Sequence, residues 1–248
     1  MKEKINILGI QYSKITFSEL LKEIESNLNQ NKITISFAPV DSTMLCYKNN
    51  YLKKIYNSFD YVLADGMPIL FASKILKKSL PERVAGLDLL QRMINLCSKK
   101  RYSVFFLGSN KKTVEKFKKK LFNNKFPVKF YCPPMKKKFN FEDNKIMIDE
   151  INKFKPDFLF VILGAPKQDI WIYENTKKID AKAIIGIGAA FDYYAGTIKR
   201  APEWMQKLGL EWLFRLIQDP KRLWKRYARD LIFPFLIIKE LIKNSIFD

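Results

Sequence analysis

Short apolar runs alternate with amphipathic stretches over most of the chain. Residues 5–17 alternate loosely and predict a small β element, and residues 18–29 predict an amphipathic helix capped by Thr16 or Ser18. Six strand-like runs follow, with helical spacing between most of them, at 33–37, 61–64, 103–107, 128–131, 158–163 and 183–187. Continuous apolar strands separated by helices are typical of a parallel sheet buried on both faces. The pattern therefore predicts an α/β fold: a Rossmann-like parallel sheet with helices on both faces.

The last fifty residues show a different pattern. Behind Pro202, apolar residues from Trp204 to Leu216 recur at helical spacing and predict one helix. Asp219-Pro220 predicts the end of that helix, and also the cap and first residue of a second helix. We expect a Rossmann-like domain over residues 1–198 and a helical appendage over residues 199–248.

No stretch of the sequence is long enough to span a bilayer, which takes roughly 20 apolar residues. The longest apolar run, 231–238, is interrupted by Pro234 and ends at Lys239-Glu240. The N-terminal apolar run is too short for a signal peptide, and the three cysteines show no CxxC spacing that would indicate a disulfide framework or a zinc site. These features predict a cytoplasmic protein whose membrane contact, if any, is peripheral.

Charge narrows the class of partner. The chain has 45 lysines and arginines against 25 acidic residues, and this net charge of +20 indicates an anionic partner: nucleic acid, phospholipid headgroups or a phosphorylated substrate. Residues 199–229 hold nine basic and three acidic residues, so basicity is concentrated in the predicted C-terminal helices. Because the chain has no histidine, a general base must be a carboxylate or a lysine.

Polar and glycine residues follow the predicted strands where each strand ends. They are Asp41, Asp65-Gly66, Gly108-Ser109, residues 164–168 and Asp192. In a doubly wound sheet such positions lie at the carboxyl edge, where these folds bind ligands. We therefore expect residues far apart in sequence to meet around one crevice.

Asp65 is the candidate general base. It ends the apolar run 61–64 and precedes Gly66, so its carboxylate is expected to project from the sheet edge into a partly desolvated crevice that raises its pKa. A plain Asp-Gly turn gives the same pattern, and the residues alone leave both readings open.

A glycine pair follows the last predicted strand. Gly186 and Gly188 can cradle a phosphate or simply allow a tight exit from the strand. The GxGxxG pattern fails because Phe191 stands at the third glycine position, so a nicotinamide site is not indicated. Asp192 is a candidate acceptor for a ribose or uracil hydrogen bond, with a helix cap as the alternative.

Four tail arginines are candidates for binding a diphosphate: Arg215, Arg222, Arg226 and Arg229. Guanidinium groups can neutralise a departing phosphate through bidentate hydrogen bonds. A solvated outer helix face gives the same spacing. Aromatic residues interleaved with these cations favour a membrane interface, namely Trp204, Trp212, Trp224 and Tyr227.

Four motifs, in order along the chain, carry a family resemblance: ADGMPIL at 64–70, LPERVAGLDLL at 80–90, ILGAPKQDIWI at 162–172 and GAAFDYYAGTIKRAPEWMQKLGLEWLFRLIQDPKRL at 188–223. The sequence resembles the WecG/TagA/CpsF glycosyltransferases, which elongate lipid-linked sugars of bacterial envelope polymers such as teichoic acid. The resemblance implies that Asp65 is the catalytic aspartate and that Arg83 approaches the donor diphosphate. It also implies that Gln168, in the turn from Gly164, holds sugar hydroxyls or an acetamido group while Lys167 contacts phosphate. Without it, Arg83 reads as a solvated arginine and the turn as structural.

The resemblance further implies an inverting transfer from a UDP-sugar donor to a polyprenyl-diphosphate-linked sugar. N-acetylmannosamine onto N-acetylglucosamine is the leading pair, and UDP-N-acetylmannosaminuronate or UDP-glucose is the alternative donor. Since the sequence has no DxD motif and no histidine, we expect transfer without metal or cofactor, with arginines in the role of magnesium. The appendage is expected to pack over the active-site edge and touch the inner face of the plasma membrane.

One motif departs from the family. After the first predicted strand the family shows Thr-x-Asn-x-acid, whereas residues 37–41 read Phe-Ala-Pro-Val-Asp. Only the acid, Asp41, is retained, so sugar specificity is open; Ser36, Ser42 or Thr43 are candidates for compensation.

Two other classes of protein also fit a basic α/β chain: a nucleic-acid-binding protein, although no binding motif is present, and a nucleotide-dependent oxidoreductase. Association into a homo-oligomer is not decided by the sequence.

Overall fold

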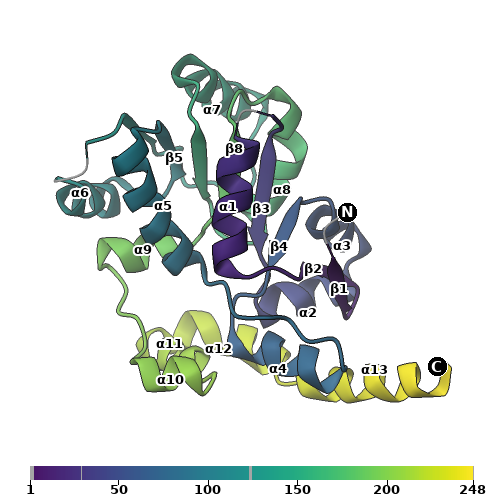
Figure 1. The fold of residues 1–248 in the computed structure, drawn as a ribbon. Coiled ribbons are helices and arrows are strands. Elements are labelled where there is room, and N and C mark those ends of the chain that lie inside the picture. The colour runs from purple at the N-terminus through teal and green to yellow at the C-terminus, as the bar shows by residue number, and fades with distance from the viewer. Residues whose placement is uncertain (1–2, 29, 123–124, 248) are drawn as a thin grey trace. The chain divides into compact units, whose positions relative to one another are not determined.

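A computed structural model of the chain describes residues 3–28, 30–122 and 125–247. Its contacts divide the described residues into two compact units. The first unit combines Met1–Glu19, Phe37–Ala85 and Arg200–Asp248, and the second combines Leu20–Ser36 and Gly86–Lys199. Each unit is thus assembled from segments that are distant in the sequence, as the colours in Figure 1 show.

Within the described residues the strands form two sheets. The small sheet is an antiparallel hairpin of β1 (Lys4–Ile7) and β2 (Ile10–Ser13), which confirms the predicted N-terminal β element. The large sheet has the order β4-β3-β8-β7-β5-β6. Its strands are β3 (Ile33–Phe37), β4 (Tyr61–Leu63), β5 (Val104–Gly108), β6 (Val128–Tyr131), β7 (Phe158–Ile162) and β8 (Ala183–Gly186). All six coincide with predicted apolar runs, and the parallel ladders confirm the predicted fold class.

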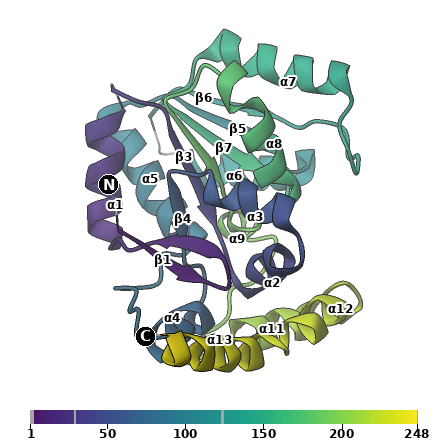
Figure 2. The same cartoon turned by 90° about the vertical axis from the view of Figure 1, so that its right-hand side faces the viewer.

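Aromatic packing holds the sheet of the second unit together. Phe106 on β5 stacks between Phe130 on β6 and Phe160 on β7, with ring centroids 5.0 and 5.2 Å away. Burying each such side chain contributes about 1.5–3 kcal/mol. The helices α5 (Gly86–Lys100), α6 (Lys111–Lys120) and α9 (Ala190–Ala195) cover one face, and α7 (Phe141–Phe154) and α8 (Lys167–Asn175) cover the other (Figures 1 and 2). A 3₁₀ turn, η1 (Thr176–Lys178), follows α8.

The N-terminal helix α1 (Phe17–Asn27) begins with a capping box. The Glu19 amide donates to Thr16 Oγ1 over 3.2 Å, and the Thr16 amide donates to Glu19 Oε2 over 2.8 Å. Of the two caps left open by the sequence, Thr16 is therefore the cap. The predicted helix extended to residue 29, which lies outside the described residues.

Helices dominate the first unit. They are α2 (Val40–Lys48), α3 (Asn50–Asn57), α4 (Met67–Ile75), α10 (Glu203–Lys207), α11 (Glu211–Gln218), α12 (Pro220–Asp230) and α13 (Phe233–Phe247). The four tail helices α10 to α13 belong to the same compact unit as residues 37–85. In particular, α12 packs on α2 and α13 packs on α4, and Figures 1 and 2 both show α13 beside α4.

The tail corrects one prediction. The single helix predicted over 204–216 is wrong, because the chain breaks at Gly209, whose φ of +75° is a left-handed conformation that ends α10. The run 231–238 is divided between a turn at Leu231 and Ile232 and the start of α13, where Pro234 stands in the first turn and needs no intrahelical amide bond. Asp219 and Pro220 cap and begin α12, as predicted.

No helix in the described part of the chain is both long enough and apolar enough to cross a membrane.

Gly108 offers a test of the sheet. A Cβ there would lie 2.4 Å from the carbonyl oxygen of Ile162, at a φ of +119°. At Gly164, with a φ of +78°, a Cβ would meet nothing within 4 Å. Gly164→Ala should therefore cost only the left-handed strain, about 1–2 kcal/mol, and Gly108→Ala should cost about 1–3 kcal/mol more. Urea unfolding of the two variants measures the difference, and equal free energies would contradict the close approach of β5 and β7.

Candidate active site

Asp65 lies two residues after the end of β4, at the turn into α4. The next residue, Gly66, adopts a φ of +132° as it leads into α4, a conformation that side chains strongly disfavour. Burial of the carboxyl group and the nearby charge of Glu211 raise the pKa of Asp65 to about 6, against the lowering effect of Arg83, Arg215 and Arg200. A carboxylate with a pKa close to neutrality can take up a proton from a reacting hydroxyl. All five charged residues belong to the first unit.

Arg83 connects the Asp65 turn with the tail. Its loop is tied to the end of β4, because the Val84 amide donates to the Ala64 carbonyl over 3.2 Å. The guanidinium group pairs with Glu211 at the start of α11, Nη1 to Oε2 over 3.4 Å, and its other arm donates to Gln206 of α10 over 3.3 Å. Arg83 therefore lies in the Asp65 cluster, although tail side chains engage it there.

The four tail arginines fall into separate groups. Arg215 acts on Asp65, whereas Arg222 pairs with Asp219, the cap of its own helix. Arg226 and Arg229 bind the two carboxylate oxygens of Asp41, which is only 7% exposed in the first turn of α2. We call Asp41, Arg226 and Arg229 the Asp41 clamp. It fixes α12 on α2, and Arg226 reaches Asp41 Oδ2 over 2.8 Å.

In the second unit, Gln168 lies against the glycine turn that follows β8. The side chain is 4% exposed, and its Oε1 is a buried atom without a hydrogen-bond partner among the described residues. A Cβ on Gly186 would lie 3.0 Å from Gln168 Nε2, and a Cβ on Gly188 would lie 3.3 Å from Oε1. The two glycines therefore make room for this amide, and its free oxygen can accept a further hydrogen bond.

The other candidate residues of the second unit, Gly164, Lys167 and Asp192, also have interaction partners within that unit. The backbone amide of Gln168 donates to the Gly164 carbonyl over 2.9 Å, and this bond lies at the start of α8. Lys167 Nζ lies 3.8 Å from the ring centre of Phe139 and donates to the Lys136 carbonyl, and burial lowers its pKa. Asp192, in the first turn of α9, accepts from the Thr197 hydroxyl over 3.3 Å.

The three hydroxyl residues near the altered motif all bond within the protein. Ser36 donates to the buried Asp169 over 2.6 Å, Ser42 accepts from Tyr56 over 3.0 Å, and Thr43 Oγ1 lies 2.6 Å from the Tyr12 hydroxyl oxygen. Each of the three is at most 1% exposed. All three hydroxyl groups are therefore buried and hydrogen-bonded within the protein.

Sequence reasoning missed Glu211, Gln206 and Arg200 in the Asp65 cluster. One signal was present: Glu211 and Arg215 are four residues apart and share a face of α11, so the candidacy of Arg215 also pointed to Glu211. Nothing in the sequence indicated that this face meets Arg83, which is 128 positions earlier.

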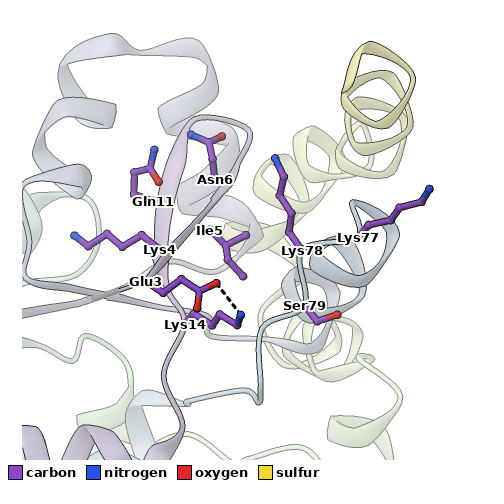
Figure 3. Close-up of a pocket in the computed structure, with 9 residues that line it drawn as sticks. All are labelled: Glu3, Lys4, Ile5, Asn6, Gln11, Lys14, Lys77, Lys78 and Ser79. Carbon is purple, nitrogen blue, oxygen red and sulfur yellow. Dashed lines mark hydrogen bonds and ion pairs between the residues drawn. The ribbon is translucent and has the colours of Figure 1, made fainter. Parts of the chain in front are cut away.

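A pocket of about 420 Å³ lies elsewhere in the first unit, at the N-terminal hairpin and the end of α4 (Figure 3). It is lined by Glu3, Lys4, Ile5, Asn6, Gln11, Lys14, Lys77, Lys78 and Ser79. Lys14 pairs with Glu3 over 2.7 Å inside it. None of the residues of the Asp65 cluster lines this pocket.

Among the described residues there is no group of three or more cysteine, aspartate or glutamate side chains placed to hold a metal ion.

A parallel α/β sheet and a near-neutral carboxylate among guanidinium groups suit an enzyme that transfers a group from an anionic donor. The model of the glycosyl transferase WecG/TagA/CpsF family matches residues 5–246. The chain belongs to this family of glycosyltransferases and is a hexosyltransferase, as the four sequence motifs predicted.

Curated relatives agree with this assignment. Proteins from Staphylococcus aureus strains MW2, NCTC 8325 / PS 47 and COL are each 28% identical over 239 residues, covering 95% of this chain and 91% of the relative. Each is named N-acetylglucosaminyldiphosphoundecaprenol N-acetyl-beta-D-mannosaminyltransferase.

The Asp41 clamp predicts a stability effect. Asp41→Asn removes the charge that two guanidinium groups share and should lower the free energy of unfolding by about 1.5–3 kcal/mol. Asp149→Asn, on the exposed side of α7, is the matched control and should stay within about 0.5 kcal/mol of wild type. Both are measured by urea unfolding. A wild-type value for Asp41→Asn would show that the clamp does not hold α12.

Proposed function

We propose that this glycosyltransferase moves N-acetylmannosamine from a UDP donor to N-acetylglucosamine on a polyprenyl diphosphate. The observation that carries the chemistry is the Asp65 cluster, with its near-neutral carboxyl group among Arg83, Arg200 and Arg215. The substrate pair rests on the name that the Staphylococcus aureus relatives carry. A different UDP-sugar donor is the alternative, because the altered residues 37–41 leave the sugar contacts open.

In the proposed reaction, Asp65 takes the proton of the acceptor hydroxyl. The freed oxygen attacks the anomeric carbon of the donor sugar from the face opposite the phosphate, so the configuration inverts. As the new carbon–oxygen bond forms, the bond to the diphosphate breaks and UDP leaves with the electron pair. The charge grows on the departing diphosphate, and guanidinium groups that meet it there lower the barrier.

Arg83 and Arg215 are the arginines that we assign to this role, because both lie in the Asp65 cluster. The Asp41 clamp and the Arg222–Asp219 pair are assigned to holding the tail, since their arginines bind carboxylates outside the Asp65 cluster. For the second unit we propose that Gln168 binds the sugar through its free amide oxygen. We assign the nucleotide and phosphate contacts expected from the sequence to Gly186, Gly188, Lys167 and Asp192. No divalent ion enters the proposal.

The tail also supports work at a membrane surface. Large apolar side chains are exposed on α4 and along the tail, a set that we call the tail surface: Phe71, Ile75, Trp204, Leu208, Ile217, Trp224, Leu231, Ile232, Phe235, Ile238 and Ile242. Lysines and arginines lie among them in the same segments, as in helices that bind the headgroup region of anionic bilayers. We propose peripheral binding to the inner face of the plasma membrane, where a lipid-linked acceptor is available.

The function is tested by presenting the purified protein with polyprenyl-diphosphate-linked N-acetylglucosamine and a panel of UDP-sugars, with and without a chelator. We expect transfer from UDP-N-acetylmannosamine that the chelator does not change. Asp65→Asn should lower the rate at least about 100-fold, the contribution typical of a general base. Transfer only from another UDP-sugar would replace the donor, and wild-type turnover by Asp65→Asn would remove the base.

Asp65→Asn, which should slow the reaction, should also make the folded protein more stable at neutral pH. Because the pKa of Asp65 is about 6 in the folded protein and lower in the unfolded chain, the folded state holds the proton more tightly. Ionisation of Asp65 therefore costs stability as the pH rises from about 4 to about 6, and this cost persists above that range. At pH 7.5, Asp65→Asn should be more stable than wild type, by no more than about 3 kcal/mol. A destabilised variant would indicate that Asp65 has a structural role.

Membrane binding is tested by sedimentation with lipid vesicles. Trp224→Ser/Phe235→Ser removes two aromatic side chains that are 53% and 73% exposed on the tail surface. The partition coefficient of the protein into vesicles should fall roughly tenfold, because the burial of two aromatic side chains is lost. Phe141→Ser, which removes a 76% exposed ring from α7, is the matched control and should bind as wild type does. Equal losses in both variants would exclude the tail surface.

A further inference from the structure

Glu211 is the second carboxylate of the Asp65 cluster and has no role in the reaction as proposed so far. It is the first residue of α11, just after the break at Gly209. Its side chain is 28% exposed, and its Oε2 pairs with Arg83 Nη1 over 3.4 Å. Glu211 thus brings a negative charge from the tail to the turn that carries Asp65.

The geometry around Glu211 fixes Arg83 from two sides. Gln206 accepts from Arg83 Nη2 over 3.3 Å, and its own amide nitrogen donates to the Ala201 carbonyl over 2.7 Å. Arg83 is therefore held between α10 and α11, with its side chain 17% exposed. A guanidinium group that is paired with Glu211 neutralises a neighbouring carboxylate less than an unpaired one would.

The charges that act on Asp65 come from three segments. Glu211 and Arg215 lie on α11, Arg83 lies between α4 and α5, and Arg200 lies before α10. Glu211 is the acid in this set, and it disfavours the charged form of Asp65, whereas the three arginines favour it. Removal of Glu211 would leave three cations acting on one carboxylate.

We propose that Glu211 is a positioning residue that holds Arg83 by an ion pair and so prevents Arg83 from neutralising Asp65, the base of the transfer reaction. The inference rests on the proposed function, in which Asp65 accepts the proton of the acceptor hydroxyl. It adds that the tail sets the strength of this base, since Glu211 and Arg215 come from the tail and Asp65 does not. The tail is then part of the chemistry as well as a membrane contact.

The test is the pH dependence of kcat/KM for sugar transfer, whose acidic limb reports the essential base of the free enzyme. Glu211→Gln should move the acidic limb to lower pH, because Asp65 loses a nearby like charge and Arg83 loses the carboxylate of its ion pair. The weaker base should also lower kcat at pH 8 by roughly tenfold. Glu211→Asp keeps the charge and should restore the limb to the wild-type pH.

Glu203→Gln is the matched control. It removes one negative charge from an exposed position on α10 and should leave both the limb and the rate unchanged. A tether without electrostatic function predicts a different outcome: Glu211→Gln would lower the rate while its acidic limb stays at the wild-type pH. That result would overturn the proposal.

Arg83→Gln provides an independent measurement if Glu211→Gln does not fold, as judged by circular dichroism. Loss of a cation should move the limb to higher pH, the opposite direction, and Arg83→Gln/Glu211→Gln should return it toward wild type. An unmoved limb in Arg83→Gln would also overturn the proposal. A wild-type protein that transfers no sugar in this assay would contradict the proposed function itself, which separates the two failures.

Discussion

The burial of one carboxyl group among opposing charges is the constraint on which the first unit depends. Asp65 is placed by a short strand and by Gly66, whose backbone conformation suits only glycine. Desolvation and Glu211 resist its ionisation, while three arginines favour it. Burial and Glu211 raise the pKa of this carboxyl group, whereas the arginines lower it. Together they leave the pKa close to the working range of a base.

This balance requires the tail. Glu211 and Arg215 act on Asp65 from α11, and α12, which follows α11 directly, is fixed by the Asp41 clamp. Asp41 is 188 positions before Arg229, so the clamp joins two segments of the first unit that are distant in the sequence. The exposed tail surface lies on these same helices and on α4. Anchoring, active-site charge and the proposed membrane contact are therefore properties of one set of helices.

Local patterns were sufficient to predict the sheet and insufficient to predict the partners of charged residues. The six apolar runs became six strands because mostly apolar residues can be buried on both faces of a parallel sheet, with the partly exposed edge strand β6 as the exception. Asp219-Pro220 was read correctly because capping depends on adjacent residues. Gly209 was read wrongly because the apolar stripe continues through it, and only its left-handed backbone reveals the break.

Ion pairs between residues that are distant in the sequence could not be predicted from local patterns. The pairing of Arg226 and Arg229 with Asp41 was not predicted, since their spacing on α12 cannot show that Asp41 lies opposite. Glu211 was overlooked for the same reason, because its partner Arg83 comes from a distant loop. Family motifs led to Asp65, Arg83 and Gln168, and the structure adds what surrounds them, including the unpaired amide oxygen of Gln168.

The central claim is that Asp65 titrates near neutrality in the folded protein. It is tested most directly by NMR, following the carboxyl carbon of Asp65 in ¹³C-labelled protein from pH 4 to pH 8, with the signal assigned by its absence in Asp65→Asn. We expect a midpoint at about pH 6. A midpoint at the ordinary value for aspartate, about 3.9, would mean that the charges around Asp65 do not set it up as a base, and it would contradict the account.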